Sequence, residues 1–423
     1  MLTGDGWLVR WIPREPITTQ AFAALCEASN TFGNGVMEIT QRGSLQIRGL
    51  TRESAALLAD TLEELDLDFD ATPVILTAPL LGRDNARAKP ALRLASQVRA
   101  RLADRTDSVL LSPKVSLILD GATELHLDAI SADIRLRAVG ERAHISFGGD
   151  ARSAVSVGWA DFGDAVAVVS AILDRLMALG RSDARARDLG GEQAAESIRK
   201  EFATQITHEP APPVRPTPES IATHALTDGT LAQALGLAFG YARASALQEL
   251  ALAARSLGAT GFCAAPGRTL ITLGLTPEAA TALAMQATQL GFVVSATDPR
   301  RYVVACAGSP VCASALLSTR ELAPRVAQAA CNLLGPGSVI HLSGCPKGCA
   351  HSKAAALTLT GPHHLVVRGR ADDLPTREIS PTEFVTDLER LNESWHRRHG
   401  AESASAVLSR VGATRPTNAT PAG

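Results

Sequence analysis

Hydrophobic and polar positions follow the same order twice along the chain. In each half, an amphipathic helical period ends at a glycine, and two short β-rich runs follow, joined by a turn that contains Gly and Arg. Residues 32–57 align with residues 257–282 without a gap, and the Gly-Leu-Thr run at 49–51 falls on the same run at 274–276. Because the order of elements is shared over a whole unit, the pattern favours an internal duplication over a chance match.

Each copy also predicts where its next elements begin. Thr51 and Thr276 are good helix caps, and Pro277 suits the first helical position. The pattern therefore predicts a helix in each copy, at 53–65 and 278–290. An extended segment is predicted after each helix, near 72–78 and 300–306.

The proline-rich stretch HEPAPPVRPTPES, residues 208–220, separates the two copies and cannot continue a helix or enter a central strand. Each half combines a small helix-and-strand unit with a larger mixed unit. The predicted boundaries are 1–75 and 76–205 for the first pair, 206–220 for the linker, 221–298 and 299–410 for the second pair, and 411–423 for a flexible tail.

Composition narrows the class of protein. A length of 423 residues predicts two or three domains, and 46% hydrophobic with 20% charged residues is typical of a globular enzyme. The net charge of −2 gives no reason to expect a nucleic acid or a membrane surface as partner. The start of the chain lacks the pattern of a signal peptide, and no apolar run is long enough to span a bilayer. We therefore expect a cytoplasmic protein, in which cysteines serve as metal ligands or core thiols before disulfides.

Four of the seven cysteines form two pairs, with spacing C-x5-C at Cys306 and Cys312 and C-x3-C at Cys345 and Cys349. Each pair follows a strand-like run, in a loop whose glycines and prolines let backbone amides approach a cofactor. Four thiolates are the usual ligands of an iron–sulfur cluster, whereas structural zinc favours spacings of two to four residues. A zinc site and a disulfide remain the alternatives. The other cysteines are expected to be small buried hydrophobes: Cys26, Cys263 and Cys331.

The paired cysteine spacing and the duplication together resemble the sulfite and nitrite reductase family. The resemblance covers nearly the whole chain and implies an α+β fold, with two ferredoxin-like half-domains and two larger mixed α/β units. It also implies a [4Fe–4S] cluster on Cys306, Cys312, Cys345 and Cys349. In the reductases the last of these cysteines also bridges to the iron of a sirohaem.

The basic residues of the first half depart from the reductase pattern. The family motif T-x-R-Q-x-x-Q-x-H-G matches at Thr40, Arg42, Gln46 and Gly49, but the histidine position is Arg48. The motif L-P-R-K-F-K corresponds to LSPKVS at 111–116, which keeps only one of its three basic residues, Lys114; the other two positions are Pro113 and Ser116. Reduction of sulfite or nitrite needs several cations around a small anion, so this depletion puts that activity in doubt.

The remaining motifs resemble the precorrin-3B synthase branch, through GDGWLVRWIP, FGNGVMEITQRGSLQIRGL, LSPKVSLILDG and SGCPKGCAH. That resemblance implies hydroxylation of precorrin-3A by dioxygen, closure of a lactone, an external NAD(P)H-linked electron donor and an additional non-haem iron. No sequence pattern identifies ligands for that iron. Arginine forks suit the carboxylates of such a macrocycle. The predicted substrate-binding residues are Thr40, Arg42, Gln46, Arg48 and Lys114. A sirohaem reductase, and an electron carrier or zinc module without catalysis, remain the alternatives.

Overall fold

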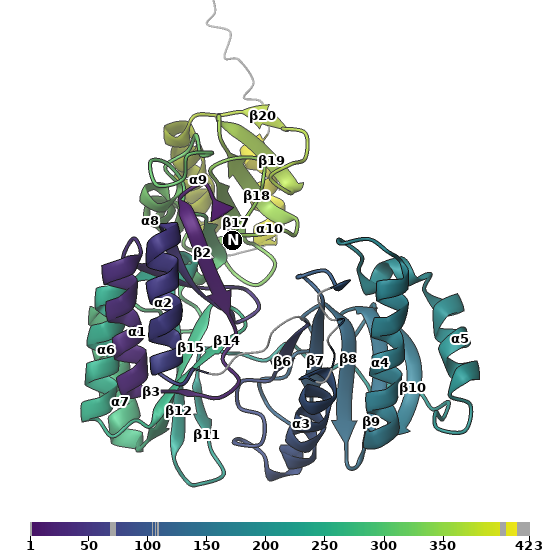
Figure 1. Cartoon of the computed structure of the whole chain (residues 1–423). Coiled ribbons are helices and arrows are strands. Elements are labelled where there is room, and N and C mark those ends of the chain that lie inside the picture. The colour runs from purple at the N-terminus through teal and green to yellow at the C-terminus, as the bar shows by residue number, and fades with distance from the viewer. Residues whose placement is uncertain are drawn as a thin grey trace, which may run out of the picture.

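The computed structural model describes residues 2–67, 73–103, 105, 107, 110–397 and 403–412, and it contains four five-stranded sheets (Figure 1). The first sheet consists of β1 (Leu2–Thr3), β2 (Gly6–Trp11), β5 (Leu45–Leu50), β4 (Val36–Ile39) and β13 (Tyr241–Arg243), in that order. Its counterpart in the second half consists of β11 (Thr223–Ala225), β12 (Leu231–Gly236), β15 (Thr269–Leu275), β14 (Gly261–Ala265) and β3 (Ile17–Thr18).

The strand registers confirm the internal duplication. Glu38 pairs with Gln46 in the first half, and Cys263 pairs with Ile271 in the second, so both partners are displaced by 225 positions (263 − 38 and 271 − 46). The same offset relates the helices that follow, α2 (Arg52–Glu64) and α7 (Pro277–Gln289). These helices start one residue before the predicted ranges, because the first helical residue directly follows the cap. The predicted caps are confirmed: Thr51 and Thr276 each accept a hydrogen bond from the backbone N–H three residues further along.

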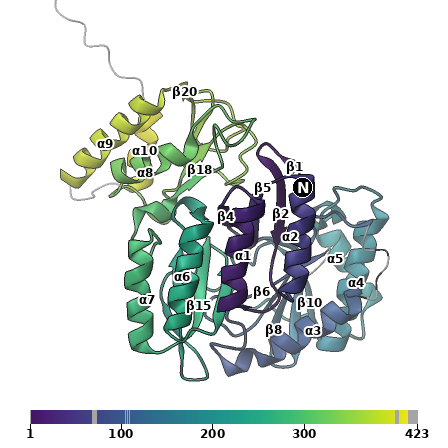
Figure 2. The ribbon, with the colours of Figure 1, turned by 60° about the vertical axis from the view of Figure 1, so that its left-hand side comes forward.

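The two half-domains exchange a strand. Strand β3 leaves the first half to pair with β14, and β13 leaves the second half to pair with β4. Helices α1 (Thr19–Phe32) and α6 (Ala244–Ser256) pack together between α2 and α7, and Figure 2 shows the four as one layer. A single apolar core lies beneath this layer, where the rings of Phe22 and Phe262 are 4.6 Å apart. Neither half-domain therefore completes its sheet or its core alone.

The two larger units share one topology, with two parallel pairings followed by two antiparallel ones. The first unit contains β6 (Val74–Thr77), β7 (Ser116–Asp120), β8 (Ala132–Val139), β9 (Arg142–Gly149), β10 (Val155–Asp161), α3 (Lys89–Ala103), α4 (Phe162–Ala178) and α5 (Glu192–Glu201). The second contains β16 (Val303–Ala305), β17 (Ile340–Ser343), β18 (Ala355–Thr360), β19 (His364–Gly369), β20 (Arg377–Glu378), α8 (Thr319–Ala329), α9 (Pro381–Arg397) and α10 (Ala404–Leu408).

The extended segments expected near 72–78 and 300–306 correspond to β6 and to a 3-10 turn followed by β16, although residue 72 lies outside the described residues. Residues 208–220 form no helix or strand. The expected tail, 411–423, begins inside a 3-10 turn at 409–412 in which Val411 is buried, and residues 413–423 lie outside the described residues. Within the described part of the chain, no helix combines the length and hydrophobicity that crossing a bilayer requires.

Candidate functional site

The paired cysteines lie at one edge of the fourth sheet. Cys306 directly follows β16, and Cys345 follows β17 after a single glycine. These strands are parallel neighbours, with Ala305 opposite Leu342, so their carboxyl ends meet at the same edge. Cys312 and Cys349 lie in the two loops that continue from this edge. The sheet thus brings together two loops that are about 40 residues apart in sequence.

The surroundings of these cysteines fit an iron–sulfur cluster. The Gly344 N–H donates to Cys306 Sγ at 3.1 Å, as amides around a cluster do. A side chain at Gly4 would overlap Cys312 Sγ, so the N-terminal hairpin also packs closely on the loops. Burial raises the pKa of the Cys349 thiol, and the neighbouring cysteines, Cys345 foremost, raise it further. The raised pKa means that the four cysteines do not all stay deprotonated side by side unless a positive charge lies among them. Bound iron would supply that charge.

A row of polar residues crosses the first sheet on the face opposite its helices. The register aligns Arg10 of β2, Gln46 of β5, Glu38 of β4 and Tyr241 of β13, and we call these four residues the polar row. With its amide oxygen turned toward β2, Gln46 accepts from Arg10 Nε at 3.2 Å and Nη2 at 3.3 Å. The residues on either side of Gln46 in β5 point into the apolar core, as alternation along a strand requires.

The corresponding face of the second half is apolar. Under the 225-residue offset, Glu38, Gln46 and Arg48 correspond to Cys263, Ile271 and Leu273. These residues pack in a separate apolar cluster with two leucines from the first larger unit, Leu80 and Leu125. The duplicated scaffold therefore has one polar face and one apolar face that is covered by the first larger unit, and the polar face is the candidate site.

Arg48 is held by carboxylates of its own chain. Its Nε and Nη2 donate to the two oxygens of Asp5 at 2.8 and 2.6 Å, and Nη1 lies 3.4 Å from Glu38 Oε2. Burial opposes the charge of Arg48, but Asp5 and Glu38 outweigh this effect and raise its pKa. The sequence predicted that Arg48 binds a substrate carboxylate, whereas in the structure its fork is occupied by Asp5.

Arg42 connects the two motifs that the sequence singled out. Its Nη2 donates to Ser116 Oγ at 3.0 Å and to the carbonyl of Ser131. Thr40 Oγ1 accepts from the N–H of Arg42 at 3.3 Å and from that of Ser44 at 3.0 Å, which fixes the turn. Burial lowers the pKa of Arg42, and the neighbouring charge of Arg185 lowers it further.

Lys114 lies close to this contact in sequence but is exposed. Asp133, beside Ser116, accepts two hydrogen bonds from Arg185 at 2.9 and 2.7 Å and one from the Ser116 N–H at 2.9 Å. A polar network therefore supports the position of Arg42, whereas Lys114 lies at its margin.

Sequence reasoning missed two arginines of the site. Arg10 is exposed, and among the described residues no ion pair joins it to a carboxylate. Arg268, which corresponds to Gly43 in the repeat, donates to Gln41 Oε1 at 2.6 Å and to the Ala350 carbonyl at 3.1 Å. The alternation of β2 could have placed Arg10 beside Gln46, but no local signal marks Arg268.

His341 of β17 is fully buried next to the second cysteine loop. Neither ring nitrogen has a hydrogen-bond partner among the described residues, and the ring lies 5.6 Å from that of His351. Burial lowers the pKa of His341 to about 3, so the ring is neutral at physiological pH. A side chain at Gly348, between Cys345 and Cys349, would come within 3.8 Å of His341.

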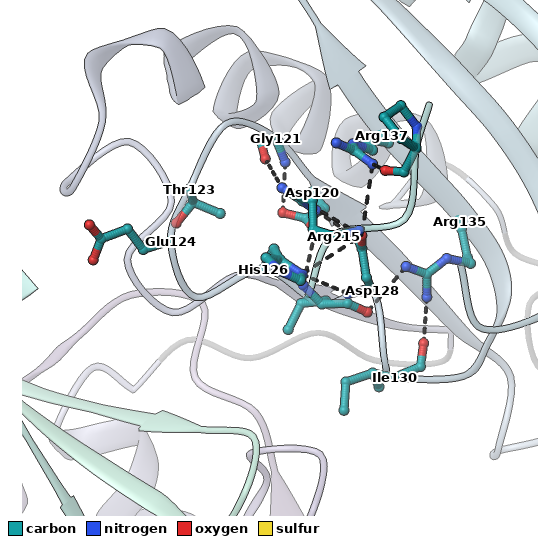
Figure 3. Close-up of polar contacts among 12 residues, drawn as sticks. Asp120, Gly121, Thr123, Glu124, His126, Asp128, Ile130, Arg135, Arg137 and Arg215 are labelled. Atoms are coloured by element: carbon teal, nitrogen blue, oxygen red, sulfur yellow. Dashed lines mark hydrogen bonds and ion pairs between the residues drawn. The ribbon is translucent and has the colours of Figure 1, made fainter. Parts of the chain in front are cut away.

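Asp120, His126 and Asp128 gather in the first larger unit, with ligand atoms within 4.8 Å of one another (Figure 3). Arg215 of the linker already pairs with both carboxylates, because its Nη2 lies 2.5 Å from Asp120 Oδ2 and 2.7 Å from Asp128 Oδ1. Arg137 Nη1 also lies 3.8 Å from Asp128 Oδ2. Because Arg215 occupies both carboxylates, the group as it stands does not fit the additional iron that the resemblance implied. Instead it fastens the proline-rich linker to the end of β7.

The remaining cysteines only partly match expectation. Cys26 is fully buried, and burial raises the pKa of the partly exposed Cys263 to about 12. The prediction that Cys331 is buried is wrong: it is exposed. The reason is that α8 ends at Ala329, and Cys331 lies in the turn beyond it.

Comparisons with known proteins agree with this architecture. Residues 16–65 match the nitrite/sulfite reductase ferredoxin-like half domain. A precorrin-3B synthase from Sinorhizobium sp is 36% identical over 424 residues, which cover 98% of this chain and 91% of that protein. The structure of the Mycobacterium tuberculosis NirA protein shares the fold, with a TM-score of 0.71 and 17% identity over 95% of this chain and 83% of that one.

Proposed function

The chain belongs to the precorrin-3B synthase family, and we propose that it converts precorrin-3A to precorrin-3B with dioxygen. One oxygen atom would enter the macrocycle as a hydroxyl at C20, and the ring A acetate would close a lactone. The other would leave as water, with two electrons and two protons from an NAD(P)H-linked donor. The full-length similarity to a precorrin-3B synthase carries this proposal, and the polar face of the first sheet supports it, because its Arg10 and Arg48 lie within electrostatic reach of Cys349.

Cys306, Cys312, Cys345 and Cys349 would hold a [4Fe–4S] cluster. When bound, the cluster would supply one-electron transfer from the external donor. Two observations support this assignment. The parallel strands β16 and β17 bring both cysteine loops to the same edge of the sheet, and the Gly344 N–H donates a hydrogen bond to the sulfur of Cys306.

The macrocycle would bind against the polar row, with its carboxylates toward arginine forks. Arg10 has no carboxylate partner in the described chain and faces the same side as Gln46, so it is the better candidate for a first contact. Arg42 would hold a second carboxylate from the turn that Thr40 fixes, and Gln46 would offer a neutral hydrogen bond. Arg48 would act indirectly, by holding Asp5 and Glu38 in place.

Absorption of the purified protein and one assay test the proposal. We expect a broad brown absorption without an intense sirohaem band, and a mass gain of one oxygen atom when oxygen follows anaerobic addition of precorrin-3A and reductant. Cys349→Ser should abolish the gain, whereas Cys331→Ser, at the exposed cysteine, should retain it. A sirohaem band in the isolated protein would favour the reductase alternative, and an intact cluster without mass gain would refute the synthase assignment.

A further inference from the structure

The two hairpin turns that the duplication relates pack directly on each other. The Gly267 N–H donates to the Gln41 carbonyl at 3.1 Å, and Arg42 forms an isolated β-bridge with Pro266. A side chain at Gly43 would come within 2.9 Å of the backbone carbon of Ala265. The two turns are therefore in direct contact, so a displacement of the turn that carries Arg42 would press on the equivalent turn of the second half.

Arg268 extends this contact to the second cysteine loop. Its Nη1 donates to Gln41 Oε1 at 2.6 Å, and its Nη2 donates at 3.1 Å to the carbonyl of Ala350, the residue after Cys349. The backbone of Arg268 is left-handed, with a φ of 64°. Its Cδ would lie only 2.7 Å from a Cβ atom at position 240, so the glycine there leaves room for the arginine side chain. The guanidinium is thus directed at the loop by a conformation that non-glycine residues seldom adopt.

The two hydrogen-bond partners of Arg268 are neutral oxygens. In the part of the chain that the structure describes, no carboxylate lies within ion-pair distance of it, although Glu38 acts on it from farther away. A partly buried cation without a carboxylate is costly unless another anion lies nearby. A cluster held by four thiolates is such an anion, and it would lie beside the loop that Arg268 contacts.

We propose that Arg268 is a positioning residue that couples the macrocycle site to the cluster. Its charge favours the more negative, reduced cluster, and its bond to Gln41 links the cluster loop to the turn that carries Arg42. This inference rests on the proposed function. Because coupling between two sites is reciprocal, bound precorrin-3A shifts the midpoint potential, and reduction of the cluster changes the affinity for precorrin-3A by the matching factor.

The test compares midpoint potentials of the iron-loaded enzyme, with and without precorrin-3A under anaerobic conditions, by redox titration followed by electron paramagnetic resonance. Arg268→Gln should lower the potential, because a positive charge near the cluster is removed. Arg268→Lys should keep the potential but lose the response to precorrin-3A, since one ammonium does not replace the two-pronged fork. Gln41→Ala should also keep the potential and lose the response. The control is Arg255→Gln, an exposed arginine at the end of α6, which should change neither quantity.

Gln41 is exposed, so its variant tests the coupling even if substitution of Arg268 impairs folding. An unchanged response to precorrin-3A in Gln41→Ala, or no response in the unsubstituted enzyme, would overturn the coupling while the proposed function stands. Absence of iron and sulfide from the unsubstituted protein would instead refute the proposed function.

Discussion

The contact between Arg48 and Asp5 decides whether Arg48 binds substrate, as its place in the motif predicts, or holds the fold. We consider Arg48→Met, which keeps the length of the side chain and removes its charge. The Arg48 side chain is 12% exposed and that of Asp5 only 1%, so the variant leaves a buried carboxylate without its cation, although the hydrogen bond from Thr3 Oγ1 remains. Breaking a buried pair from one side costs about 3–5 kcal/mol of unfolding free energy.

The pH dependence of stability should change sign with the variant. Burial acts to raise the pKa of Asp5, but the hydrogen bonds and charge of Arg48 outweigh it and hold that pKa below its ordinary value. In the unsubstituted protein this carboxylate therefore stabilises the fold above its unfolded pKa, and the contribution is lost as the pH falls through the folded pKa. Without Arg48, burial prevails and the folded pKa of Asp5 rises, so the variant regains stability as the pH falls through that raised pKa toward the unfolded pKa.

Urea unfolding of the unsubstituted protein, Arg48→Met, Asp5→Leu and the double variant measures the coupling. We expect the double variant to recover most of the loss, because no charge is then left buried alone. A loss below about 1 kcal/mol in Arg48→Met, together with much weaker precorrin-3A binding, would refute the structural role and restore the role that the sequence predicted.

Further predictions concern the cysteine loops, the turn and the linker. Cys349→Ser should lose iron and brown colour together, since three thiolates rarely retain a cluster, and full iron content in the variant would contradict the ligand set. Arg42→Lys should raise the dissociation constant of precorrin-3A roughly tenfold, because a two-pronged fork becomes a point charge; unchanged affinity in an absorbance titration would place Arg42 outside the site. Arg215→Met should destabilise the protein by about 3–5 kcal/mol in urea unfolding, because it leaves Asp120 buried without its cation and leaves Asp128 with the more distant Arg137. A chelator should leave the unfolding midpoint of an iron-free preparation unchanged, and a lowered midpoint would show that a metal holds those carboxylates.

The sequence by itself determined the features that depend on local patterns. Thr51 and Thr276 cap their helices because capping needs only a hydroxyl three residues before an N–H. The 225-residue offset reproduces the strand registers because alternation of side chains fixes which residues face the core. The cysteine spacing indicated two strand-end loops, and the structure has β16 and β17 leading into them.

Only the tertiary structure decided what the charged side chains contact. Arg48 pairs with a carboxylate 43 positions away, and Arg268 reaches an amide 227 positions away across the exchanged halves. Such contacts leave no periodic signal, because they depend on how completed sheets and turns pack rather than on neighbours in the chain. For the same reason, the motif identified Arg48 as a carboxylate binder, but the fold supplied the carboxylate from Asp5.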